Sequence, residues 1–335
     1  MRHDTRRQVF ERAGPTNYRT VQVDSDTLNR LTHAIDEHPE DADLYWTRAD
    51  IYAKHQQYAA ALSDFTIAIS LAPEESDIHG SRANTYAALN RHDDAIAGYD
   101  RAIELAPDSA LHYFNRANSY SSLEQSQEAL ADLDRALDLD PDYTEAYSSR
   151  GIILNELHRY ADAVADFSRA IDLEPAKPNP HFNRAMSYGH MKRYQESLSD
   201  LDRALERGFA ASDHLYYTRG KTCAHLERYS DALADLDRSI ALSPDNADAF
   251  ADRAYCYNKF GRYEEALSDL RRAIAIDQHC ASAYINFAVS LRGLDRLEEA
   301  LPYLERASQL NDPERAAQAQ SMLRQAETML GRYRT

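Results

Sequence analysis

The chain repeats with a period of 34 residues, and this period constrains the fold more than any other feature of the sequence. Proline-bearing turns keep this step along the first half of the chain, at Pro73, Pro107, Pro141 and Pro175. A fixed period in this range is typical of stacked repeats, in which no single unit can bury its apolar face alone. The period therefore favours recognition along an extended surface over catalysis in a pocket.

Each repeat contains two helix-like halves. With position one at Ala42, positions eight, twenty and twenty-seven are small, and positions four and twenty-four are mostly large. The residues at position eight are Ala49, Ala83, Ala117, Gly151, Ala185, Gly220, Ala254 and Ala288. Spacings of three, four and seven predict helices, and small residues let two helices approach closely. Each repeat is therefore predicted to be a helix-turn-helix hairpin.

The repeat has a recognisable consensus. It reads aromatic-x-x-Arg-Ala/Gly-x-x-Tyr, followed by Tyr-x-x-Ala-x-x-Asp-Phe/Leu-x-Arg-Ala-Ile-x-Leu-x-Pro. This pattern resembles the tetratricopeptide repeat, with eight full units over residues 42–314. The resemblance implies an all-α fold, a right-handed α-solenoid superhelix whose first helices line a concave groove for partner proteins. It is highly specific for the fold and says little about the partner.

The two ends differ from the repeats. Residues 1–24 carry no helical period and are expected to be irregular, with one strand-like run over residues 18–23. Residues 25–41 match only the second helix of a unit, with Leu31 and Ala34 at the packing positions. Residues 315–335 are expected to form a capping helix and tail, because the last repeat would otherwise expose an apolar face.

The composition narrows the class of function. The formal net charge of −17 disfavours nucleic acid and anionic membranes as partners. Three cysteines without metal-ligand spacing fit a reducing compartment, and no stretch approaches the roughly 20 apolar residues of a membrane span. The sequence predicts a cytoplasmic protein whose partner is a protein or peptide, possibly basic. It leaves the oligomeric state open.

No pattern in the sequence indicates catalysis. There is no Gly-rich phosphate loop, and the thirteen histidines lack the H-x-x-x-H and H-E-x-x-H spacings of metal sites. The tyrosines fall mainly at repeat positions four, eleven and seventeen, where they are explained by packing. We therefore expect no catalytic, metal or cofactor site and no enzymatic activity.

Charge pairs are built into the repeat. Position seven is Arg in seven units, and position twenty-three is Asp in six of those seven. The two positions change together, which predicts a bidentate Arg–carboxylate pair across each hairpin. The exception is Arg82, which lies opposite Gly98 and must find Asp94, Asp100, water or a partner.

A second irregularity is one extra residue between repeats five and six, where Gly208 is expected to end a helix in a left-handed conformation.

The resemblance places positions two, five, six, nine, twelve and thirteen on the concave surface, where packing does not dictate the residue. From the first repeats to the last, the residues at these positions change from acidic, through asparagines and aromatics, to basic and His-rich. Amide side chains both donate and accept hydrogen bonds, so they suit a bound peptide backbone. The predicted protein-binding residues are Trp46, Asp50, Asn84, Phe114, Asn115, Asn118, Asn155, Phe182, Asn183, Tyr217, Lys221, Tyr255 and Asn258.

One specialisation of the family is disfavoured. Members that clamp the carboxylate tail of heat-shock chaperones need three cations, and Gly80, Glu145 and Ser149 stand at those positions.

The preferred interpretation is a non-catalytic adaptor that holds a protein segment in its groove. The alternatives are a regulatory or inhibitory subunit whose acidic surface covers a basic enzyme or toxin domain and, more weakly, targeting of protein glycosylation. No catalytic domain follows the repeats, which counts against the last.

Overall fold

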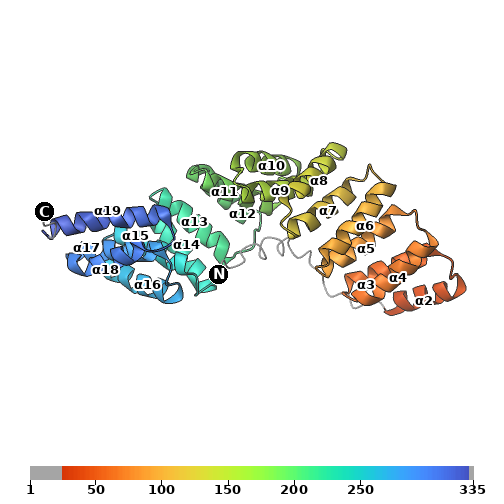
Figure 1. Ribbon diagram of the computed structural model, residues 1–335, viewed down its shortest axis with the longest axis horizontal. Helices are drawn as coiled ribbons and strands as arrows, with labels where there is room; N and C mark the ends of the chain where they lie inside the picture. Colours follow the sequence, from red (N-terminus) through yellow and green to blue (C-terminus); the bar gives the residue numbers. More distant parts are fainter. Residues whose placement is uncertain (1–24, 332–335) are drawn as a thin grey trace. The chain divides into compact units, whose positions relative to one another are not determined.

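The computed structural model describes residues 25–331, and eighteen helices with no strand lie in that range (Figure 1). The first helices of the hairpins are α3 (Ala42–Lys54), α5 (Ser76–Ala88), α7 (Ala110–Ser122), α9 (Thr144–Glu156), α11 (Pro178–His190), α13 (Asp213–His225), α15 (Ala247–Lys259) and α17 (Ala281–Gly293). The second helices are α4 (Tyr58–Leu71), α6 (His92–Leu105), α8 (Ser126–Leu139), α10 (Tyr160–Leu173), α12 (Tyr194–Glu206), α14 (Tyr229–Leu242), α16 (Tyr263–Ile276) and α18 (Leu297–Ser308). A single helix, α2 (Ser25–Glu37), precedes them, and α19 (Pro313–Met329) follows them.

The predicted all-α fold of stacked helical hairpins is confirmed. The strand-like run over residues 18–23 lies outside the described residues. Clustering of contacts divides the chain into two compact units, Met1–Ala146 and Tyr147–Thr335, with the division inside α9.

Short left-handed turns join the two helices of each hairpin. One residue of each turn has a positive φ, from 57° at Asn90 to 70° at Gly261. Only Gly261 is a glycine, so seven of the eight hairpins accept this conformation with a side chain present. The backbone N–H of the residue after the left-handed one then donates back to a carbonyl of the first helix, as Arg91 does to Tyr86. This geometry satisfies groups that a helix end leaves unpaired.

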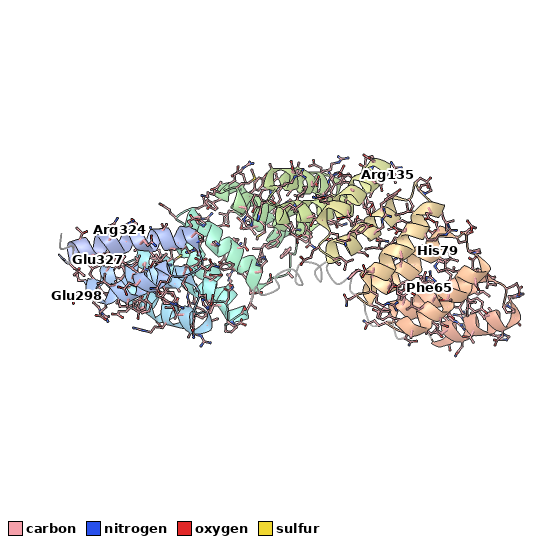
Figure 2. All side chains as sticks on the ribbon, viewed as in Figure 1. Phe65, His79, Arg135, Glu298, Arg324 and Glu327 are labelled. Atoms are coloured by element: carbon pink, nitrogen blue, oxygen red, sulfur yellow. The ribbon has the colours of Figure 1, made fainter. Side chains whose placement is uncertain are left out.

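The core of each hairpin alternates small and large side chains. Ala49 and Ala83, at position eight of the first two repeats, have no exposed surface. Phe65 of α4, labelled in Figure 2, and Phe167 of α10 are likewise fully buried. The two helices approach closely at Gly151, where an added Cβ would lie 2.8 Å from the Phe167 ring. Small residues on one helix and large ones on the other therefore set the helix separation.

The predicted bidentate charge pairs are present in all six hairpins that carry both residues. In the α9–α10 hairpin, Arg150 donates from Nε and Nη2 to the two Asp166 oxygens over 2.8 and 2.7 Å. The other five pairs are Arg48–Asp64, Arg116–Asp132, Arg184–Asp200, Arg219–Asp235 and Arg253–Asp269. The carboxylates are buried, which makes these pairs part of the hairpin core and unavailable to a ligand.

The joint between α12 and α13 departs from the other repeats. Gly208 adopts φ +82°, so the expected left-handed end of α12 is confirmed. A cleft of about 260 Å³ opens beside this joint, between α12, α13 and α14. Its charges are already paired with one another, as in Arg228–Asp231 and Arg219–Asp235. An altered stacking angle at this joint stays a prediction.

Candidate partner-binding surface

All thirteen predicted binding residues lie on first helices of the hairpins. The first unit contributes six of them from α3, α5 and α7, and the second contributes seven from α9, α11, α13 and α15. Some of their side chains are engaged in contacts within the protein, and others are not. Those that keep free polar groups are better candidates for binding than those that serve the scaffold.

Trp46 and Asp50 of the first unit meet on one face of α3, next to α5. The Trp46 indole Nε1 donates to the Ser81 hydroxyl over 3.2 Å, which ties the two helices together. Burial raises the pKa of Asp50, while Lys54 and a hydrogen bond from Ser81 lower it. Both side chains remain half-buried, so this acidic and aromatic patch is still partly accessible.

Phe114 lies on α7 and packs against Tyr143, with ring centroids 4.8 Å apart. Tyr143 comes from the loop that precedes the next hairpin, so this contact links neighbouring repeats. Asn84 of α5 accepts a hydrogen bond from the Tyr99 hydroxyl. Phe114 is half-buried and Asn84 is exposed, so each has both a packing contact and an accessible part.

The asparagines fall into two groups. Asn155 and Asn258 each accept a hydrogen bond, over 2.8 Å, from a serine of the next first helix, Ser187 and Ser290 respectively. These two side chains therefore act partly as ties between repeats. Asn115, Asn118 and Asn183 make no side-chain hydrogen bond with the described residues.

Phe182 was expected to be an exposed aromatic anchor, and this expectation is wrong. Its side chain is only 6% exposed. The ring stacks on Phe209 of the α12–α13 loop at 4.5 Å and contacts His214 edge-on at 5.3 Å. The extra residue at this joint places Phe209 over position five of α11. Phe182 is thus a packing residue, and we do not propose it for binding.

Tyr217 and Asp252 form a half-buried polar pair on neighbouring first helices of the second unit. Burial raises the pKa of Asp252 to about 6, although Lys221 and a hydrogen bond with Tyr217 lower it. One Asp252 oxygen is buried with no hydrogen-bond partner among the described residues. Burial and Asp252 together raise the pKa of Tyr217. A buried carboxylate with an unsatisfied oxygen costs folding free energy when it ionises.

This cost leads to a prediction about pH. The folded-state pKa of Asp252 is raised above its unfolded value, so the contribution of Asp252 to stability is fully present below the unfolded pKa of 3.8 and is lost as pH rises through about 6. Asp252→Asn removes the ionisation and is expected to stabilise the protein by about 1–3 kcal/mol at pH 7.5. Urea unfolding at pH 4.5 should show a much smaller gain. A gain independent of pH, or an equal gain from the exposed Asp248→Asn, would contradict the assignment.

Unpaired cations gather on the first helices of the second unit. Lys221, Lys259 and Arg292 are exposed, and no carboxylate lies within ion-pair distance of them in the described chain. Lys221 lies over the Tyr217 ring at 5.7 Å, and Lys259 lies over the Tyr255 ring at 5.1 Å. In a chain of net charge −17, cations without carboxylates are the groups left for an external anion.

Two histidines beside these cations stack on tyrosines of the preceding repeat, which the sequence did not indicate. His190 stacks on Tyr160 at 4.7 Å and His225 stacks on Tyr194 at 4.3 Å, both with nearly parallel rings. The tyrosine is at position seventeen and the histidine at position thirteen of the next repeat. Burial and Lys221 lower the pKa of both imidazoles, with His158 adding to the effect on His190 and Lys192 to that on His225. A search for pairs between neighbouring repeats would have found this register.

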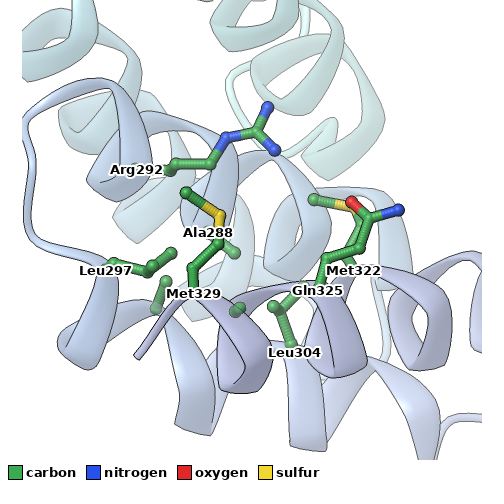
Figure 3. A pocket seen from close by; sticks show the side chains of 9 residues that line it. Ala288, Arg292, Leu297, Leu304, Met322, Gln325 and Met329 are labelled. Carbon is green, nitrogen blue, oxygen red and sulfur yellow. The ribbon is translucent and has the colours of Figure 1, made fainter. Parts of the chain in front are cut away.

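A small apolar pocket lies where α19 covers the last hairpin (Figure 3). Leu297 and Leu304 of α18 and Met322 and Met329 of α19 line it, with Arg292 at its edge. Its volume of about 20 Å³ leaves room for little more than one water molecule. It therefore offers no site for an organic ligand, and α19 acts here as a cap on the last repeat.

This architecture, in which neighbouring helical hairpins pack on one another, defines an α-helical repeat protein. The tetratricopeptide repeat model matches residues 46–110, 114–179, 182–245 and 224–279, and a second model of the same description matches residues 280–311. Because these matches cover most of the chain, the protein belongs to the tetratricopeptide repeat family.

Solved structures show the same fold. The C-terminal part of a repeat protein from Cytophaga hutchinsonii matches with a TM-score of 0.57 and 17% identity, covering 72% of this chain and 98% of that one. The pilF protein of Pseudomonas aeruginosa matches with a TM-score of 0.56 and 16% identity, covering 61% of this chain and 92% of that one. A tetratricopeptide repeat protein from Parabacteroides merdae matches with a TM-score of 0.52 and 16% identity, covering 79% of this chain and 99% of that one. A comparison with curated protein sequences found no match. No helix within residues 25–331 is long and apolar enough to cross a membrane.

Proposed function

We propose that this protein is a non-catalytic adaptor that holds a segment of a partner protein along its first helices. The family and the fold support a protein-interaction role. The observation that carries the finer proposal is the contrast between paired and unpaired cations. The scaffold arginines are bound to buried aspartates, whereas Lys221, Lys259 and Arg292 keep their charge free on the first helices of one unit.

The proposal assigns different ligand chemistry to the two units. In the second unit, the free cations and the tyrosine rings beneath two of them suit an acidic segment. In the first unit, Asp43, Asp50 and Asp77 suit a basic segment, and Trp46 and Phe114 supply apolar contact. Unbonded amides at Asn115, Asn118 and Asn183 are free to hold a peptide backbone.

The first test measures binding of a fluorescent glutamate-rich peptide to the full chain by anisotropy. Lys221→Glu with Lys259→Glu is expected to weaken binding at least about tenfold at low salt, because two attractive charges become repulsive. The matched control is Arg272→Glu with Arg306→Glu, which makes the same charge change at exposed residues of second helices. Equal loss from both double variants would contradict a site on the first helices.

The same assay carries a pH prediction. The pKa values of His190 and His225 are lowered, so both imidazoles are neutral at pH 7.5 and gain charge only as pH falls below 6.5. The groups that face them are Tyr160, His158, Tyr194, Lys192 and Lys221. Affinity for the acidic peptide should therefore rise between pH 7.5 and 5.5. The rise should disappear in His190→Gln with His225→Gln.

The second candidate function is a regulatory or inhibitory subunit that covers a basic enzyme or toxin domain. The net charge of −17 favours it. A partner isolated from native lysate separates the two functions. Charge reversals on the first helices abolish its binding if the protein is a groove adaptor, and reversals of exposed acids on the second helices abolish it if the acidic exterior is the interface.

A further inference from the structure

The repeated Arg–Asp pair contains a second acceptor that approaches from solvent. In the third repeat, Arg116 donates from Nε and Nη2 to Asp132 over 2.7 Å and from Nη1 to Asp100 of the preceding second helix over 2.6 Å. Arg253 uses Asp237 in the same way over 2.7 Å. Asp100 and Asp237 are 49% and 57% exposed. A carboxylate can therefore reach the outer side of this guanidinium from solvent.

Arg82 is the copy of this arginine that has neither carboxylate. Gly98 stands where the inner Asp should be, and Thr66 stands where the outer one should be. The Thr66 hydroxyl donates to the Leu62 carbonyl over 2.7 Å. Arg82 makes no ion pair with residues 25–331, and its Nε is buried without a hydrogen-bond partner.

The acids that could have compensated are engaged elsewhere. Asp94 accepts from Arg91 over 2.7 Å, and Asp100 accepts from Arg116. The inner position is also closed to a larger residue, because a Cβ at Gly98 would lie 2.8 Å from the Ala83 Cβ. An acceptor for Arg82 can therefore come only from the outer side, by the route that Asp100 and Asp237 take.

We propose that Arg82 is a docking point for a carboxylate side chain of a partner protein, on the outer side of α4, α5 and α6. The ligand chemistry is defined by the molecule itself, which fills this outer slot with a carboxylate in three other repeats, from Asp100, Asp202 and Asp237. A planar guanidinium fork matches a carboxylate through two parallel hydrogen bonds. This site is separate from the first-helix surfaces of the adaptor proposal and does not depend on it.

The test follows the arginine Nε–Hε resonances of the full-length protein by NMR, with sodium acetate as the carboxylate probe. Arg82→Lys assigns the resonance. The Arg82 signal is expected to shift along a saturating curve. The signal of Arg272, which is exposed and makes no ion pair among the described residues, should change only linearly with salt. Thr66→Asp copies Asp100 and should move the Arg82 signal without acetate and remove its response, whereas Thr66→Asn should leave the response intact.

Each possible result of these titrations either supports or contradicts a carboxylate site at Arg82. A saturating response that Thr66→Asp removes supports a carboxylate site. Equal responses of Arg82 and Arg272, or a full response in Thr66→Asp, would overturn it. Inorganic phosphate is the second probe, and saturation at much lower concentration than acetate would replace the carboxylate with a phosphorylated ligand and so refute the assignment made here.

Discussion

Asp200→Ala is expected to lower the free energy of unfolding by about 3–5 kcal/mol, which is the cost of leaving a buried charge without its partner. Asp200 is 2% exposed, and its two oxygens accept from Arg184 over 2.7 and 2.9 Å. The His181 ring also lies 3.5 Å from this carboxylate. Removing it leaves a guanidinium between two helices that has only Ser168 as an acceptor in the described chain. Urea unfolding followed by circular dichroism measures the loss.

Two variants make this result specific. Asp172→Ala, an exposed acid of the preceding hairpin, should change stability by less than about 0.5 kcal/mol. Replacing both partners by apolar residues, as in Arg184→Met with Asp200→Leu, should recover much of the loss, because neither partner is then left unpaired. If Asp200→Ala and Asp172→Ala unfold at the same urea concentration, the pair does not hold the hairpin together.

Phe182→Ala is the second variant for which we expect a large effect, of about 3–5 kcal/mol. The side chain is 6% exposed and stacks on Phe209, so truncation opens a cavity at the joint between α11, α12 and α13. The control is Phe260→Ala, whose side chain is 47% exposed and should contribute less than about 1 kcal/mol. Normal stability of Phe182→Ala would show that the ring is not needed for packing and would return it to the binding candidates.

The repeat made the scaffold predictable. Arg150 and Asp166 could be paired from sequence because the same two positions change together in seven of the eight copies, so one chain supplied its own comparison. The left-handed turns were harder to predict, since residues such as Gln56 and Glu124 rarely adopt a positive φ. There the helix end must satisfy its carbonyls within a short hairpin turn, and this requirement outweighs the local preference of the residue.

The candidate surface was predictable only in part. Asn155 and Asn258 were placed on the correct helices, but their hydrogen bonds to Ser187 and Ser290 join side chains 32 residues apart. The stacks of His190 and His225 on tyrosines of the preceding repeat arise in the same way. Such contacts depend on how one repeat lies on the next, which periodicity within a repeat does not specify.

The sequence by itself therefore determined the class of fold, the hairpin register and the internal charge pairs, because these depend on residues at fixed spacings within one repeat. The tertiary structure decided which side chains stay free. It buried Phe182 beneath Phe209, left Lys221 and Lys259 exposed without carboxylates, and left Arg82 without an acceptor among the described residues. The physical reason is that exposure is a property of the space between neighbouring helices, and that space exists only once the repeats are stacked.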